Sequence, residues 1–166
     1  MTCAKLLLIV TNADVRRRLL ATWHDFVIRQ PGTNLRGAPE AETTEAPVAF
    51  SRLNVRPGLD LALFIVDGGW RREYVCRALA AEVEGYCLLL GDSPADLSLA
   101  HGLLQLLGDM TPGMIAGTAE GSDDLLRSVL ALPPDTAIPV VDCDDRESVT
   151  ELVCTLLEQV AVLQAV

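Results

Sequence analysis

Aromatic and basic side chains are both scarce in this chain. Phenylalanine, tryptophan and tyrosine together make up 4% of the residues, and lysine occurs once, at Lys5. Lysine and arginine number 13 against 23 aspartates and glutamates, which gives a net charge of -10 and a pI near 4.5. A surface this acidic repels phosphate backbones and anionic lipid, so we expect neither nucleic acid nor a membrane surface as a partner.

Long hydrophobic runs and paired metal ligands are also missing. The apolar runs fall short of the roughly 18 to 20 residues that a membrane helix needs. The N-terminal segment MTCAKLLLIVTNAD has one lysine and a short apolar stretch, and it lacks the long apolar region and the cleavage site of a signal peptide. We therefore expect a cytoplasmic protein without membrane insertion. His24 and His101 have no second ligand at metal-binding spacing, so no metal site is expected.

The cysteines do not form a disulfide pattern. They are odd in number and scattered among mostly apolar residues, which predicts reduced core thiols in place of a disulfide framework or a zinc cage. The five are Cys3, Cys76, Cys87, Cys143 and Cys154.

The apolar sequence that is present suffices for one packed core. The chain has 166 residues, of which 50% are hydrophobic and 22% are charged. That length is close to the usual size of one domain, and that composition is typical of a folded globule. Since no repeat or linker interrupts it, we expect a single domain over residues 1–166.

Short apolar runs alternate with amphipathic segments along the chain. Continuous apolar runs bounded by turn residues indicate buried strands, and apolar residues at spacings of three and four indicate helices. Ser93 followed by Pro94 marks a helix start, because serine caps helices and proline is tolerated in the first turn. The patterns predict strands over residues 4–11, 47–55, 59–66, 86–90, 114–117 and 138–141, and helices over 14–28, 70–83, 93–107, 122–130 and 144–163.

This order of elements predicts an α/β fold. Residues 47–55 and 59–66 are separated only by a turn at 56–58, so they form an antiparallel hairpin. The other strands are separated by helices and therefore run parallel. We expect a three-layer domain with a mostly parallel central sheet of about six strands, an antiparallel edge strand over residues 47–55, and about five helices. Residues 30–47 are expected to form a long loop.

The order of elements and three segments resemble small Ras-like GTPases. The segment LPPDTAIPVVDCDDRESVTELV, which begins at Leu132, is similar to the ending of a bacterial branch: the gliding-motility type and the predicted GTPases encoded beside roadblock-domain proteins. Thr43-Thr44-Glu45 lies where the family keeps a threonine run in its first switch. VDGGWRREY, which begins at Val66, resembles the second switch. The resemblance implies a Ras-like domain, similar to P-loop NTPases.

The phosphate-binding loop of that family is degenerate in this chain. In the motif GxxxxGK followed by Ser or Thr, glycines let backbone N–H groups surround the phosphates, the lysine reaches the terminal phosphates, and the hydroxyl ligates Mg²⁺. Here Val10 and Val15 replace the glycines, Arg16 replaces the lysine, and Arg17 replaces the hydroxyl. Asp14 adds a negative charge where phosphate would lie.

The other nucleotide motifs have changed as well. The base-reading motif NKxD falls on Gly117-Thr118-Ala119-Glu120, which keeps only an acidic acceptor at Glu120. In the second switch, Gly69 and Trp70 stand where the family has Pro and then the Gly whose N–H meets the γ-phosphate. Loss in every motif together is expected of a fold that is retained for another purpose.

The resemblance and these departures imply a degenerate small GTPase, a pseudo-GTPase, that acts in signalling as a regulatory or scaffold subunit. We expect no efficient GTP hydrolysis and no cofactor. In the related GTPases the switch face contacts roadblock-type dimers, so the expected partner is a roadblock-domain dimer or a related GTPase; a homo-oligomer is also compatible. The contact is expected at Trp70, Arg71, Arg72 and Tyr74, which belong to residue types enriched in interface hot spots.

A divergent but active nucleotide switch is one alternative. It would bind GTP or GDP with Mg²⁺ and hydrolyse GTP slowly. The residues left to hold the nucleotide would be Arg16, Arg17, Thr44 and Glu120.

A receiver-like signalling domain is the second alternative, with Asp60 or Asp67 as the phosphoacceptor. Such a domain needs paired acids after its first strand and a lysine after its fifth. This chain offers only Asp14 in the first place, and its one lysine is Lys5.

Three local clusters each have two interpretations. The arginines at 16–18 form either an anion site at a helix N-terminus or a solvated helix face. Trp70 either joins a protein contact or packs under the loop at 30–46. The acidic residues at 142–147 either bind a divalent cation or cap the last helix.

Overall fold

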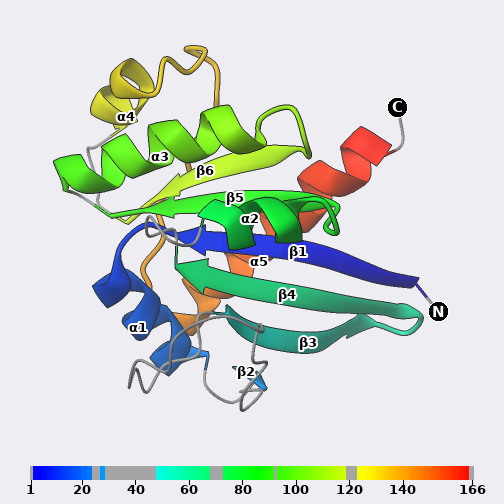
Figure 1. Cartoon of the computed structure of the whole chain (residues 1–166). Helices are drawn as coiled ribbons and strands as arrows, with labels where there is room; N and C mark the ends of the chain where they lie inside the picture. The colour runs from blue at the N-terminus through cyan, green and yellow to red at the C-terminus, as the bar shows by residue number, and fades with distance from the viewer. Residues whose placement is uncertain are drawn as a thin grey trace.

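A mixed β-sheet lies between two layers of helices (Figure 1). The computed structural model describes residues 2–23, 27–28, 48–67, 73–91, 93–118 and 123–164. The predicted α/β class is confirmed. The elements in chain order are β1 (Thr2–Val10), α1 (Ala13–Thr22), β2 (Val27–Ile28), β3 (Val48–Arg56), β4 (Leu59–Asp67), α2 (Glu73–Ala80), β5 (Gly85–Leu90), α3 (Pro94–Leu107), β6 (Gly113–Gly117), α4 (Asp123–Val129) and α5 (Arg146–Gln164).

The sheet has the strand order β2-β3-β4-β1-β5-β6. The central strand β1 runs parallel to β4 on one side and to β5 on the other, and β6 is parallel to β5. β3 is antiparallel to β4, and the turn between them places Gly58 at φ 87°, a backbone conformation that favours glycine. This antiparallel pair is incompatible with the all-parallel sheet of a receiver domain.

The sheet carries a separate hydrophobic core on each face, because successive side chains of a strand point to opposite sides. In β1, Leu6, Leu8 and Val10 pack with residues of α1 and α5. Leu7 and Ile9 pack on the other face with residues of α2, α3 and α4. Burial on both faces explains why the parallel strands are continuous apolar runs in the sequence.

The first helix is shorter than predicted. Residues 14–28 were expected to be one helix, but α1 ends at Thr22, and Val27–Ile28 forms the two-residue strand β2. β-branched residues such as these favour strands, and here they pair antiparallel with β3. Because β2 lies outside β3, the prediction that residues 47–55 form the edge strand is also wrong.

The predicted strand at 138–141 is reduced to one bridge, between Gly117 and Val140. Gly117 donates to the carbonyl of Pro139 at 3.0 Å and accepts from Val141 at 2.8 Å. Continuing the ladder from this bridge towards Ile138 would require an N–H at position 139, which proline lacks. The last helix also starts later than predicted, at Arg146.

Helix α3 begins as predicted. The Ser93 hydroxyl accepts from the backbone N–H of Asp96 at 3.1 Å, and the Asp96 carboxylate accepts from the backbone N–H of Ser93 at 3.2 Å, which completes a capping box. Among the described helices, none combines the length and the apolar character needed to cross a membrane.

The cysteines are free, as expected, but they are not all in the core. Cys76, Cys87 and Cys143 are buried, whereas Cys3 and Cys154 are exposed. Burial raises the pKa of the Cys87 thiol, so this group stays protonated and packs as a small apolar residue.

Candidate functional site

The connections that follow β1, β5 and β6 lie at the same edge of the sheet (Figure 1). The chain leaves β1 for α1 on one face and leaves β5 for α3 on the other. In open α/β sheets such a reversal opens a crevice beyond the strand ends, and ligands bind there. The nucleotide site implied by the resemblance would lie at this edge, so we consider its residues first.

Only Thr11 and Asn12 connect β1 to α1. Asn12 has extended backbone angles, and its side-chain oxygen accepts from the backbone N–H groups of Asp14 at 2.9 Å and Val15 at 3.2 Å. These are free N–H groups of the first helical turn, the donors that bind phosphate in a phosphate-binding loop. In this chain the Asn12 side chain already occupies them.

Hydrogen bonds also fill the space between the ends of β1 and β5. The N–H of Thr11 donates to the carbonyl of Leu89 at 3.1 Å, and the Thr11 hydroxyl accepts from the N–H of Gly91 at 3.2 Å. The Asn12 side-chain amide donates to the Asp96 carboxylate at 3.4 Å. Residues from β1, β5, α1 and α3 are therefore bonded to one another where a crevice would open.

This junction is tightly packed and carries a buried negative charge. A Cβ at position 91 would overlap a carboxylate oxygen of Asp96 and lie 3.0 Å from the Cβ of Asn12, so the close approach requires Gly91. Asp96 is 5% exposed. A phosphate at this point would face a carboxylate, which electrostatic repulsion disfavours.

The segment aligned with the phosphate-binding motif, from Val10 to Arg17, has a two-residue connection where the motif has a longer loop. Val10 is the last residue of β1, two residues form the connection, and α1 begins at Ala13. Val10 and Val15, which stand in the two glycine positions, are buried in the core between the sheet and helices α1 and α5. The segment therefore has no backbone turn that could surround a phosphate.

The three consecutive arginines point in different directions. Arg16, in the position of the motif lysine, is 4% exposed, so the interpretation of all three as a solvated face is wrong for this residue. Arg17 is exposed and pairs with Asp14 one turn earlier, and Arg18 pairs with Asp144 from the segment before α5. Successive helical residues are separated by about 100°, which explains the different orientations.

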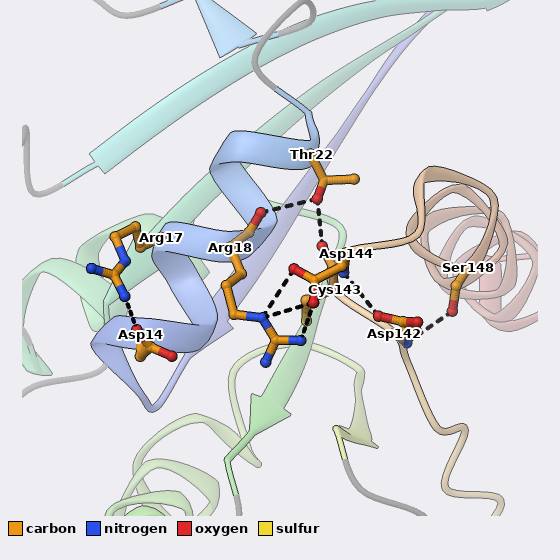
Figure 2. A network of polar contacts seen from close by, with 8 residues as sticks. All are labelled: Asp14, Arg17, Arg18, Thr22, Asp142, Cys143, Asp144 and Ser148. Atoms are coloured by element: carbon orange, nitrogen blue, oxygen red, sulfur yellow. Dashed lines mark hydrogen bonds and ion pairs between the residues drawn. The ribbon is translucent and has the colours of Figure 1, made fainter.

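Arg18 takes part in a network that ties α1 to the segment before α5 (Figure 2). Its Nε donates to both carboxylate oxygens of Asp144, at 3.0 and 3.1 Å. These bonds lower the pKa of Asp144 and raise that of Arg18. The Thr22 hydroxyl donates to the carbonyls of Arg18 and Cys143, at 3.0 and 2.6 Å. Burial raises the pKa of the Cys143 thiol to about 11, so it is a neutral thiol at pH 7.

The acidic residues at the start of α5 cap the helix and its preceding turn. Asp142 accepts from the N–H of Asp144 at 2.9 Å, and Asp145 accepts from the N–H groups of Glu147 at 3.3 Å and Ser148 at 3.0 Å. The capping interpretation is therefore confirmed for Asp142 and Asp145, whereas Asp144 pairs with Arg18. Within the described part of the chain, no cluster of three or more histidine, cysteine or acidic side chains is arranged to hold a metal ion.

A cavity of about 210 Å³ lies beside the network of Figure 2. One of its lining residues, Thr118, belongs to the segment aligned with the base-reading motif. The volume is below the roughly 300 to 1,000 Å³ of most ligand pockets. The lining residues are Arg18, Thr118, Val140, Val141, Asp142 and Cys143.

Of the expected protein-contact residues, Tyr74 is described and is 78% exposed at the start of α2. Trp70, Arg71 and Arg72 lie outside the described residues. Thr44 and Glu120, two of the residues expected to hold a nucleotide, also lie outside the described residues. The other two, Arg16 and Arg17, do not converge on one point, because Arg16 is buried and Arg17 is exposed.

The residues that define this edge were only partly visible in the sequence. Asparagine is a residue type that caps helices, and the spacing of Ser93 and Asp96 is that of a capping box. No pattern indicated that Asn12 and Asp96, 84 residues apart, would bond to each other.

No known family model matches this chain. A stretch of 51 residues, 31% of the chain, is 41% identical to the human (Homo sapiens) collagen alpha-1(XVIII) chain and spans 3% of that protein. A collagen triple helix needs glycine at every third position, whereas this chain has 12 glycines in 166 residues and an α/β fold. The similarity therefore carries no argument about fold or function.

Proposed function

We propose that this chain is a degenerate Ras-like GTPase domain that serves as a regulatory or scaffold subunit and binds a protein partner. The order of elements supports the Ras-like part of the proposal: a strand, a helix, an antiparallel hairpin, and then alternating helices and parallel strands. The last strand of the family pattern is reduced, because among residues 138–141 only Val140 pairs with the sheet, in a single bridge.

The single observation that carries the proposal is the Asn12 cap. Phosphate binding at this helix would need the backbone N–H groups that the Asn12 side chain occupies. It would also need the space that is filled by the Thr11–Gly91 and Asn12–Asp96 hydrogen bonds. The chain would lose a helix cap and bury an anion beside a carboxylate if it bound a triphosphate here.

Hydrolysis would require still more. Phosphoryl transfer is accelerated almost entirely by positioned charges and Mg²⁺. The position of the metal-ligating hydroxyl holds Arg17, whose guanidinium pairs with Asp14. A cation cannot replace a magnesium ligand, so we expect no GTPase turnover.

A titration with a fluorescent guanine nucleotide and Mg²⁺ tests this proposal, with an active small GTPase as the positive control. We expect no saturable binding below the millimolar range and no nucleotide released when the purified protein is denatured. Submicromolar affinity, or co-purified GTP or GDP, would overturn the degenerate assignment.

The protein-binding part of the proposal rests on residue types at the second-switch region and on the exposure of Tyr74. Candidate partners are a roadblock-domain dimer and a related GTPase. We expect that Trp70→Ala combined with Arg72→Ala abolishes co-purification with such a partner. Arg17→Ala, an exposed arginine on α1, is the matched control and should leave it unchanged. Equal binding by both variants would place the contact elsewhere.

A divergent nucleotide switch remains the second candidate, and the cavity beside Thr118 and Cys143 is the observation that favours it. A ligand held there by its base alone would bind equally well as nucleoside or as triphosphate. Guanosine and GTP with equal, weak affinities would support base binding without a switch, whereas a strong preference for GTP would support the switch.

A further inference from the structure

The outer surfaces of α2 and α3 carry very little charge. These helices pack side by side on one face of the sheet (Figure 1). Among their side chains whose exposure is described, Arg77 is the only exposed charged one, because Asp96 is buried. The opposite helical layer differs sharply. Its α1 and α5, with the segment before α5, expose three arginines, Arg17, Arg18 and Arg146, and seven carboxylates: Asp14, Asp142, Asp144, Asp145, Glu147, Glu151 and Glu158.

Arg77 also differs in its bonding from three other exposed arginines. Arg17, Arg18 and Arg52 each pair with an aspartate of this chain. No ion pair joins Arg77 to the residues that the structure describes. It lies three residues after Tyr74 on α2, so both exposed side chains share one side of the helix. The pair therefore offers an aromatic ring and an available guanidinium next to each other.

Small uncharged side chains lie next to Tyr74 and at the start of α3, whereas Glu82 after α2 and His101 and Gln105 further along α3 are also exposed. Ala78 and Ala81 follow Tyr74 at helical spacing, and Ala95 and Ser98 are exposed on α3. Protein interfaces are enriched in tyrosine and arginine and depleted in acidic residues and lysine, which is the composition found here. Small side chains around a tyrosine allow a partner helix to approach closely.

We propose that the outer surface of α2 and α3, centred on Tyr74 and Arg77, docks an amphipathic protein segment that carries carboxylates. An unpaired guanidinium favours a carboxylate partner. A basic segment would instead be attracted to the acidic layer formed by α1 and α5. The inference rests on the proposed function in one respect only, namely that the chain acts through protein contacts; it does not require a degenerate nucleotide site.

Three amphipathic peptides of about 15 residues, a length that supports a helix, test this proposal. They share the same leucine positions and differ only in whether the polar positions are Glu, Gln or Lys. Each is titrated into isotope-labelled protein while the backbone amide shifts are followed. We expect the Glu peptide to shift the amides of Tyr74, Arg77 and Ser98 and to bind about fivefold more tightly than the Gln peptide. The Lys peptide should shift amides of α5.

Two substitutions and one control make the test specific. Arg77→Gln should reduce the affinity for the Glu peptide to that for the Gln peptide, and Tyr74→Ala should weaken both. Arg17→Gln removes another exposed arginine, on the opposite layer, and should change neither. All three side chains are exposed, so an unchanged melting temperature is expected and verifies the fold.

Several results would overturn the proposal: equal affinities for the Glu and Gln peptides, shifts confined to other elements, or no effect of Arg77→Gln. A dimer detected by light scattering and lost in Tyr74→Ala would assign the surface to a second copy of the chain instead. Tight GTP binding would overturn the proposed function and leave the peptide result intact. Absence of both GTP and peptide binding would overturn the docking surface alone.

Discussion

The side-chain amide of Asn12 donates to the carboxylate of Asp96 at 3.4 Å and joins the first turns of α1 and α3. Each residue also caps its own helix, Asn12 through Asp14 and Val15, and Asp96 through Ser93. The two helices lie on opposite faces of the sheet. A hydrogen bond between the two helices therefore spans the edge at which an α/β sheet usually admits a ligand.

Removing the Asn12 side chain should destabilise the protein. Asn12→Ala leaves two N–H groups of α1 without their acceptor, and loss of such a cap lowers the free energy of unfolding by about 1 kcal/mol. Asn12→Ser keeps a capping oxygen but replaces the amide that reaches Asp96 with a shorter side chain, so its stability should lie between that of Asn12→Ala and the unchanged chain. Urea denaturation measures both. If Asn12→Ala is as stable as the unchanged chain, the cap contributes nothing.

Alanine should have opposite effects at two glycines. A Cβ at position 91 overlaps Asp96, so Gly91→Ala should lower the free energy of unfolding by roughly 1 to 3 kcal/mol. Gly102 lies inside α3 with open space around the position of a Cβ. There alanine should raise the free energy of unfolding by up to about 1 kcal/mol, since it favours the helix. Thermal melts of the two variants provide the comparison, and equal shifts in one direction would contradict it.

The Arg18–Asp144 ion pair should make the free energy of unfolding depend on pH. Hydrogen bonding by Arg18 lowers the pKa of Asp144 below its ordinary value of 3.8. The pair therefore stabilises the fold above that value, and its contribution disappears as the pH falls through the lowered pKa of the folded state. Asp144→Asn should be less stable than the unchanged chain at pH 7, and the two should converge below pH 3.8.

Urea midpoints measured across this pH range check that expectation. The contribution is small because both side chains are exposed and screened by solvent. Glu158→Gln removes an exposed carboxylate on α5, outside the Arg18–Asp144 pair, and is the control, for which the same stability as the unchanged chain is expected at pH 7. A constant gap between Asp144→Asn and the unchanged chain at every pH would show that the ion pair does not cause the difference.

Replacing Pro139 should extend the sheet. Pro139→Val supplies the missing N–H beside the bridge between Gly117 and Val140, and valine favours strands. The amide at position 139 should then exchange with solvent about as slowly as that of Val141, which already donates to Gly117. Hydrogen exchange followed by NMR distinguishes the outcomes. Rapid exchange at position 139 would mean that factors other than the proline end the ladder.

The fold was predictable where one local signal dominated. β1, β4 and β5 are buried on both faces, so their sequences are continuous apolar runs. The two-residue strand β2 was not predicted, because Val27 and Ile28 also continue the apolar spacing of α1. Pairing with β3 makes these residues a strand and not the last turn of a helix. Local spacing carries no information about such pairing.

The candidate site was less predictable, because it depends on contacts between distant segments. The burial of Val10 and Val15, which stand in the positions of the motif glycines, follows from the apolar strand and helix patterns that contain them. The burial of Arg16 could not be inferred, because a run of arginines does not reveal which residue faces inward. The bond from Asn12 to Asp96 depends on how two helices meet across the sheet.

Among the residues whose exposure is described, α1, α5 and the segment before α5 expose seven carboxylates, whereas α2 and α3 expose none. On a positively charged support at low ionic strength, the protein should adsorb through α5 and its preceding acidic turn. The side of α2 that bears Tyr74 would then face the solution in every adsorbed molecule. The chain would thus form an oriented layer without a tag or a chemical linker.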